Sequence, residues 1–208
     1  RTMSLANITD MSHGGADPQA VQALERGLIS WCDALQSHMT SRAQSGFVRR
    51  CHGDLHLRNI VVIDGRPTPF DALEFDDELA SGDVYYDLAF LLMDLMYRGL
   101  GPMASRLLCR YVLITDDFEG MKALPLFLAT RAAVRAKVSI LRHISHENDA
   151  EAGAYLILGR QFLEPKLPCL VAIGGLSGTG KSTLAYAFGP TLSPAPGAVV
   201  LRSDVLRK

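Results

Sequence analysis

Two prolines divide the sequence into parts with different patterns. Pro165 and Pro168 interrupt residues 164–168, and each proline disfavours helix in the residue before it. Before this break, apolar residues recur at helical spacing over residues 86–96, 102–114, 124–144 and 150–163. After it, a short apolar run leads into a glycine-rich stretch. We therefore expect two domains, residues 1–164 and 165–208.

The first part also contains a helix and a β-hairpin before its long helical run. Asp17 and Pro18 form a typical N-cap and first helical position, and the apolar spacing that follows predicts a helix to about residue 43. Asp64 and Gly65 are typical of a hairpin turn, and they separate predicted strands at residues 59–64 and 67–75. The expected class of this part is α+β, mostly helical.

The second part has the pattern of a phosphate-binding loop. Residues 175–182 fit GxxxxGK[ST], between a predicted strand at residues 169–173 and a predicted helix at 182–188; a second strand is expected at 198–201. In such loops backbone N–H groups and a helix N-terminus surround phosphates, the lysine reaches β- and γ-oxygens and the serine hydroxyl ligates Mg²⁺. A glycine-rich turn without ligand is the alternative. The predicted nucleotide-binding residues are Gly175, Ser177, Gly178, Thr179, Gly180, Lys181, Ser182 and Thr183, with Ser182 also a metal ligand.

Asp204 and Arg207 follow the second predicted strand, where the ligand crevice of an open α/β sheet lies. Their spacing resembles the DxxR element of the P-loop kinases that include polynucleotide kinase and zeta toxin. Asp204 is therefore a candidate general base, and Arg207 a candidate phosphate-binding residue. An N-capping aspartate followed by a solvated arginine is an equally simple explanation.

Composition narrows the classes of partner. The 21 basic and 22 acidic side chains give a net charge of −1, so we expect no nucleic-acid partner. The richest apolar run, residues 88–97, contains Asp94 and is too short to span a bilayer, and we find no signal peptide. Four scattered cysteines without a metal-ligand spacing favour reduced thiols and a cytoplasmic protein.

A second motif with catalytic potential lies between the first helix and the hairpin. Asp54 and Asn59 have the D-x-x-x-x-N spacing that protein kinases use, in which the carboxylate faces the attacking hydroxyl and the amide oxygen binds Mg²⁺. Asp71, twelve residues beyond Asn59, lies where a second metal-binding acid is expected, although Glu74 and Asp76 are close alternatives.

The sequences HGDLHLRN, FDALEFD and YYDLAFL together resemble the aminoglycoside phosphotransferase family. With the glycine-rich loop, the chain is similar to a bacterial architecture in which such a domain is fused to a P-loop ATPase domain. The resemblance implies the C-terminal lobe of a kinase-like fold, ATP and Mg²⁺ as cofactors, and a small-molecule acceptor. It further implies Asp54 as the catalytic base, Asn59 and Asp71 as Mg²⁺ ligands, and His52 and Asp87 as supports of the loop.

The resemblance also indicates missing parts. A kinase-like enzyme holds ATP beneath an N-terminal β lobe, yet only 51 residues precede His52, and the P-loop unit lacks its remaining strands. We therefore expect a fragment with a truncated P-loop domain. The expected function is ATP-dependent phosphotransfer to a small hydroxylated acceptor. The alternatives are an ATP-binding or ATPase regulatory protein whose kinase-like part is a binding module, and an inactive fragment.

Other polar residues fit structural roles. His56, His143 and His146 are expected to pack at the surface or in loops, because none has a second metal ligand at suitable spacing. Arg131, Arg135 and Lys137 form a basic helical face that could approach a phosphate, but a solvated face is the commoner explanation.

Overall fold

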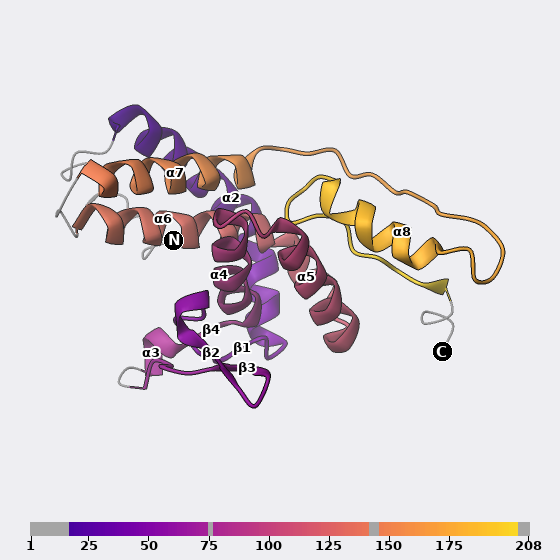
Figure 1. The fold of residues 1–208 in the computed structure, drawn as a ribbon. Helices are drawn as coiled ribbons and strands as arrows, with labels where there is room; N and C mark the ends of the chain where they lie inside the picture. The colour runs from indigo at the N-terminus through magenta and orange to yellow at the C-terminus, as the bar shows by residue number, and fades with distance from the viewer. Residues whose placement is uncertain (1–16, 75–76, 142–145, 204–208) are drawn as a thin grey trace.

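The computed structural model describes residues 17–74, 77–141 and 146–203. Five helices build the body of the molecule, which lies to the left and centre of Figure 1. In it α6 and α7 run side by side, α2 packs against both, and α4 packs on α6 and α5. These helices are α2 (Pro18–Gln44), α4 (Val84–Tyr97), α5 (Gly101–Thr115), α6 (Leu124–Leu141) and α7 (His146–Leu163).

All five helices were predicted from apolar spacing, and the structure confirms them with small shifts at their ends. The predicted cap of α2 is present, since the Asp17 side chain accepts a hydrogen bond from Gln19 N at 3.0 Å. The helix expected at residues 150–163 begins earlier, at His146. The buried faces form one core in which Leu24, Leu92, Leu128 and Leu156 are at most 1% exposed. No helix among the described residues has the length and apolarity needed to cross a bilayer.

The predicted hairpin is confirmed, with a shorter second strand. β2 (Ile60–Ile63) pairs antiparallel with β3 (Arg66–Pro69), and Asp64 and Gly65 both adopt positive φ in the turn. The second strand was expected to reach residue 75 but ends at Pro69. The reason is local: Asp71 has a φ of +61°, which a regular strand cannot accommodate.

A second small sheet was not predicted. β1 (Val48–Arg50) pairs antiparallel with β4 (Ser81–Asp83), which follows a single helical turn, α3 (Asp77–Ala80). Two 3₁₀ turns, η1 (Leu57–Asn59) and η2 (Glu119–Lys122), complete the loops of the body. The β1–β4 pairing sets the position at which the chain enters the loop that begins at His52.

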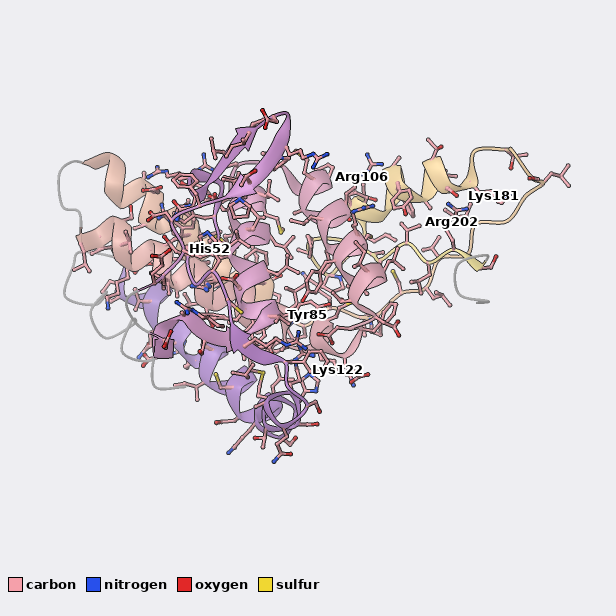
Figure 2. All side chains as sticks on the ribbon, turned by 90° about the horizontal axis from the view of Figure 1, so that it is seen from below. His52, Tyr85, Arg106, Lys122, Lys181 and Arg202 are labelled. Carbon is pink, nitrogen blue, oxygen red and sulfur yellow. The ribbon has the colours of Figure 1, made fainter. Side chains whose placement is uncertain are left out.

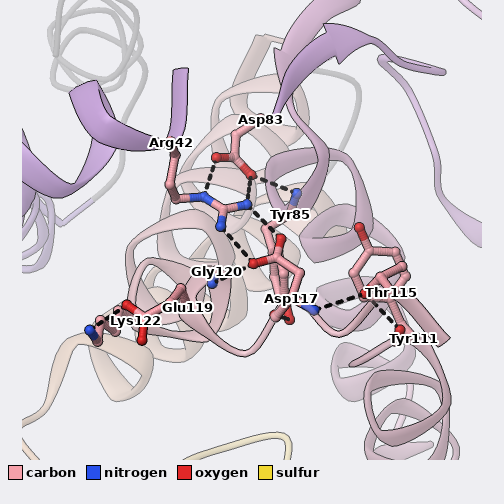
Figure 3. Close-up of polar contacts among 9 residues, drawn as sticks. All are labelled: Arg42, Asp83, Tyr85, Tyr111, Thr115, Asp117, Glu119, Gly120 and Lys122. Atoms are coloured by element: carbon pink, nitrogen blue, oxygen red, sulfur yellow. Dashed lines mark hydrogen bonds and ion pairs between the residues drawn. The ribbon is translucent and has the colours of Figure 1, made fainter. Parts of the chain in front are cut away.

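A buried network of charged side chains connects the β1–β4 sheet to the helices (Figure 3). Arg42, which is 3% exposed, donates from Nε to Asp83 at 2.6 Å and from Nη1 to Asp117 at 2.8 Å. Burial opposes its charge, but the hydrogen bonds to Asp117 and Asp83 raise the pKa of Arg42 above its ordinary value. Asp83 also caps α4 by accepting from Tyr85 N at 2.9 Å. One arginine on α2 thus joins β4, α4 and the loop after α5.

The C-terminal segment, residues 164–203, is built differently. The chain leaves α7 at Leu163 and runs without regular structure to α8 (Lys181–Phe188) and η3 (Gly189–Thr191) beside α5 (Figure 1). Arg106 of α5 lies 5.5 Å from the Tyr186 ring centroid, and the Cys109 thiol accepts a hydrogen bond from Val200 N at 3.4 Å. This segment therefore packs on α5 through a few contacts.

The two strands predicted in this segment are wrong for the described residues. Residues 169–173 and 198–201 have no strand assignment there, so the predicted βαβ unit is reduced to its helix, α8. A β-strand is defined by ladder hydrogen bonds to a neighbour, and neither segment belongs to a sheet within the described part of the chain.

Candidate functional site

A carboxylate of α4 binds the start of the loop at residues 52–59 through hydrogen bonds. Asp87, 9% exposed, accepts hydrogen bonds from His52 N at 3.2 Å and Gly53 N at 2.9 Å. Gly53 has a φ of +80°, and a Cβ at this position would lie 2.6 Å from Leu73 Cδ1. The His-Gly sequence thus lets the backbone approach Asp87 and Leu73 together, and Asp87 makes the contacts that the family resemblance implies.

A second buried carboxylate of α4 holds the far end of the same loop. Asp94, 4% exposed, accepts from Leu57 N at 2.9 Å and from Arg98 Nε at 3.1 Å. Asp87 and Asp94 are seven residues apart and lie on the same face of the helix, because seven residues are close to two helical turns. The loop therefore rests on α4 at two points.

Arg131 is a third support, and the prediction of a solvated basic face is wrong for it. Its side chain is buried, and it donates from Nη2 to Gly53 O and from Nε to Tyr86 O, both at 3.1 Å. The guanidinium lies 3.8 Å from the Tyr86 ring centroid and 3.9 Å from Asp87. Burial lowers the pKa of Arg131 from its ordinary value, although Tyr86 and Asp87 act in the opposite direction. It binds the loop backbone rather than solvent.

Asp54 and Asn59, the predicted catalytic pair, are in contact. Asn59 Nδ2 donates to the backbone oxygen and to Oδ2 of Asp54, both at 3.0 Å. Because these bonds engage the amide nitrogen, the amide oxygen of Asn59 faces away from Asp54. Asn59 is 7% exposed, whereas the Asp54 side chain is 42% exposed. A buried residue thus orients a carboxylate that solvent can reach.

The segment that carries Asp71 is tied to this loop by its backbone. Phe70 N donates to Asn59 O at 3.0 Å, Leu73 N donates to His52 O at 2.9 Å, and His52 Nε2 lies 2.9 Å from Phe70 O. Since a carbonyl oxygen only accepts, His52 donates from Nε2. This contact fits the scaffold role implied for His52. Its other ring nitrogen, Nδ1, is buried and has no hydrogen-bond partner among the described residues.

Asp71 itself is exposed and has left-handed backbone geometry away from any hairpin turn or helix end. Such conformations in non-glycine residues concentrate at functional sites. Glu74 is also exposed, and Asp76 lies outside the described residues. No group of three or more histidine, cysteine, aspartate or glutamate side chains in the described ranges could hold a metal ion. The predicted donors, an amide and a carboxylate oxygen, suit Mg²⁺, which keeps water and phosphate oxygens as further ligands.

His56 belongs to the same loop and was not predicted to take part in the site. Its Nε2 lies 3.4 Å from Asp54 Oδ2, and its side chain is 11% exposed. Burial lowers the pKa of His56 from its ordinary value, although Asp54 acts in the opposite direction. The feature of the sequence that could have indicated this contact is the position of His56, two residues after Asp54. His143 and the side chain of His146 lie outside the described residues.

The glycine-rich loop has the conformation that its glycines permit. Gly175, Gly178 and Gly180 have φ values of +151°, +79° and +81°, and Gly180 precedes α8 directly. Lys181, the first residue of α8, donates from Nζ to Leu176 O at 2.5 Å, and Thr179 Oγ1 donates to the same oxygen at 2.8 Å. The lysine side chain therefore folds back over the loop.

A cavity of about 570 Å³ lies beside this loop. Ser177, Gly178, Lys181 and Ser182 line it, together with Arg202, and Figure 2 shows Lys181 and Arg202 side by side at this end of the molecule. The other predicted nucleotide-binding residues, Gly175, Thr179, Gly180 and Thr183, are in the surrounding loop and helix. Asp204 and Arg207 lie outside the described residues. In Figure 2 the loop at His52 is well separated from Lys181.

Comparison with known proteins now defines the class. The model of the phosphotransferase enzyme family matches residues 5–124, more than half of the chain, so the chain belongs to this family of kinase-like enzymes. The matched region includes Asp54, Asn59, Asp71, Asp87 and Asp94.

Particular relatives carry no assigned activity. Uncharacterized proteins of Mycobacterium tuberculosis strain H37Rv and of Mycobacterium bovis are each 30% identical to the chain in an alignment of 207 residues that covers 97% of the chain. The chain spans 41% of the length of each of these proteins. No solved structure matches the chain.

Proposed function

We propose that this chain contributes the acceptor-activating site of an ATP-dependent phosphotransferase that acts on a small hydroxylated substrate. The observation that carries the proposal is the Asp54–Asn59 pair, in which a buried amide orients an exposed carboxylate on a loop fixed to α4. Such a carboxylate, at a family-matched position, is suited to orient a hydroxyl and accept its proton.

In the proposed reaction the acceptor hydroxyl binds at Asp54. As the acceptor oxygen forms its bond to the γ-phosphorus of ATP, the bond from that phosphorus to the bridging oxygen breaks and ADP leaves. The hydroxyl proton passes to Asp54 and then to water. Asn59 and Asp71 would hold Mg²⁺, which supplies charge neutralisation of the transferred phosphoryl group. The remaining contribution of the chain is positioning.

The glycine-rich loop is proposed as a second nucleotide-binding site. Its support is the positive φ of three glycines, the lysine at the start of α8 and the adjacent cavity that Lys181, Ser182 and Arg202 line. Backbone N–H groups of such a loop and the start of its helix attract phosphate. Asp204 as a base and Arg207 as a phosphate ligand remain predictions.

A second candidate function follows from the place of the cavity. The cavity lies at the glycine-rich loop and could hold ATP there. In this second function ATP is hydrolysed at that loop, and the kinase-like part serves only as a binding module. The two functions differ in whether turnover depends on the acceptor and on Asp54.

The test measures ADP release by the full-length protein with a panel of sugars, aminoglycosides and nucleosides. Asp54→Asn is expected to lower acceptor-dependent turnover by about 10²- to 10⁴-fold, while Lys181→Ala leaves most of it. Asp64→Asn is the matched control, because Asp64 is an exposed turn residue with positive φ, which asparagine tolerates. Turnover that is lost with Lys181 but survives the Asp54 change would overturn the proposal and support the second candidate.

A further inference from the structure

His56 has a fixed place beside the proposed catalytic base. Its Nε2 is 3.4 Å from Asp54 Oδ2, and its Nδ1 accepts a hydrogen bond from Arg58 N at 3.2 Å. The ring also packs edge-on against Phe90 of α4, with the ring centroids 5.2 Å apart and an angle of 79° between the planes. A ring held on three sides cannot rotate freely, so Nε2 stays directed at Asp54.

The hydrogen bond from Arg58 determines which nitrogen of a neutral His56 carries the proton. A backbone N–H can only donate, so Nδ1 must present its lone pair. In neutral imidazole the proton is then on Nε2, the atom that faces Asp54 Oδ2. His56 therefore offers a donor to the carboxylate without requiring a positive charge.

Asp54 Oδ2 already has one donor, because Asn59 Nδ2 binds it at 3.0 Å. A second donor from His56 would place both protein contacts on this one oxygen. Oδ1 would then be the oxygen left for the acceptor hydroxyl. Without such contacts an exposed carboxylate turns broadly about its terminal bond, and its two oxygens exchange places.

We propose that His56 is a positioning residue for Asp54: its Nε2–H donates to Oδ2 in the reacting complex and leaves Oδ1 as the atom that takes the acceptor proton. The 3.4 Å contact shortens to a hydrogen bond when the acceptor binds, as catalytic contacts commonly tighten in the Michaelis complex. The inference rests on the proposed function, since it requires Asp54 to be the base.

Two substitutions separate positioning from a purely structural role. His56→Gln keeps a side-chain N–H near the place of Nε2 but loses the acceptor near Nδ1. His56→Asn keeps an acceptor for Arg58 N but is too short to reach Asp54. Positioning predicts that His56→Asn lowers kcat by about 10- to 100-fold with an acceptor KM within about twofold of wild type, and that His56→Gln retains most of kcat. The reverse order of the two variants, or equal activity, overturns the inference.

A measurement without turnover tests the same contact. Long-range ¹H–¹⁵N NMR of the wild-type full-length protein at neutral pH is expected to show His56 protonated on Nε2 and not on Nδ1. Protonation on Nδ1 overturns the inference even if a variant fails to fold. Failure of the proposed function is distinguishable, since Asp54→Asn would then keep full turnover. Failure of this inference alone leaves turnover dependent on Asp54 but unchanged by His56→Asn.

Discussion

The loop at residues 52–59 and the loop at residues 174–180 are both candidate phosphate-handling elements, but they are supported in opposite ways. The first is held by buried side chains of α4 and α6, among them Asp87, Asp94 and Arg131. The second owes its shape to positive φ at glycines and precedes a helix with no buried residue. Leu167 and Leu170 in its segment are 90% and 95% exposed.

This difference shows which contacts determine the geometry of each site. In the body, the position of Asp54 depends on residues far away in the sequence, so damage to the core should disturb the site. In the C-terminal segment, the loop conformation is local, and changes to its apolar side chains should have small effects on global stability. The following predictions test this contrast.

The largest effect is expected from the buried charge network. Arg42→Met leaves Asp83 and Asp117 buried without their cation, so it should lower the free energy of unfolding by about 3–5 kcal/mol. Lys166→Met, which removes the exposed Lys166–Glu164 pair of the segment, should leave the free energy of unfolding nearly unchanged, because solvent screens this pair. Urea unfolding measures both. Equal losses would remove the contrast between the two regions.

Apolar truncation should show the same contrast. Leu24→Ala removes a side chain with 0% exposure from the core and should destabilise the protein by about 2–5 kcal/mol. Leu170→Ala, at 95% exposure, should change the unfolding free energy by less than about 0.5 kcal/mol. Thermal and urea unfolding provide the comparison. A large cost at Leu170 would show that the segment is part of the cooperative core.

The conformation of the glycine-rich loop can be changed by a substitution that leaves the helical body unchanged. Gly180→Ala places a Cβ in open space but at a φ of +81°, which costs about 1–2 kcal/mol and should weaken binding of a Mg²⁺–ATP analogue about tenfold. Gly174→Ala is the matched control, because Gly174 also has open space but no positive φ. Calorimetric titration measures the affinity. Equal affinity in the two variants would show that the loop conformation does not matter for binding.

The smallest effect concerns acid stability. Burial raises the pKa of Asp117, but the hydrogen bonds from Arg42 and Gly120 N outweigh it, so the pKa is below its ordinary value. Asp117 therefore stabilises the fold above about pH 4, and this contribution is lost as the pH falls through its lower folded-state pKa. In the Asp117→Asn variant, the free energy of unfolding should therefore decrease less between neutral and acid pH than it does in the wild type. Asp116→Asn, at an exposed neighbour, controls for the lost charge; an equal reduction there would contradict the assignment.

Local signals in the sequence predicted most of the body. Apolar spacing located five helices, and Asp64-Gly65 located the hairpin, because these patterns report on neighbouring residues. The β1–β4 pair was missed because its strands are three residues long and 31 residues apart at their nearest ends. The strands at residues 169–173 and 198–201 were predicted from apolar content alone, which does not guarantee a pairing partner.

For the candidate site, the sequence predicted the motif residues but not the residues that support them. The spacing of Asp54, Asn59 and Asp71 is visible along the chain, and the contact of Asp54 with Asn59 follows from it. Arg131 was misread because its partners are 45 and 78 residues away. His56 packs in its loop as predicted, but the direction of its ring depends on Phe90 and Arg58 N, which no spacing rule reports.

Asp87 and Asp94, the two carboxylates beneath residues 52–59, also couple the order of this loop to that of α4. The amides of His52, Gly53 and Leu57 donate to Asp87 and Asp94, so the loop cannot move away from α4 without breaking three hydrogen bonds to two buried carboxylates. Amide hydrogen exchange at these three positions should therefore be slow and should match that of α4. The loop that carries the candidate site thus belongs to the same folding unit as the core beneath it.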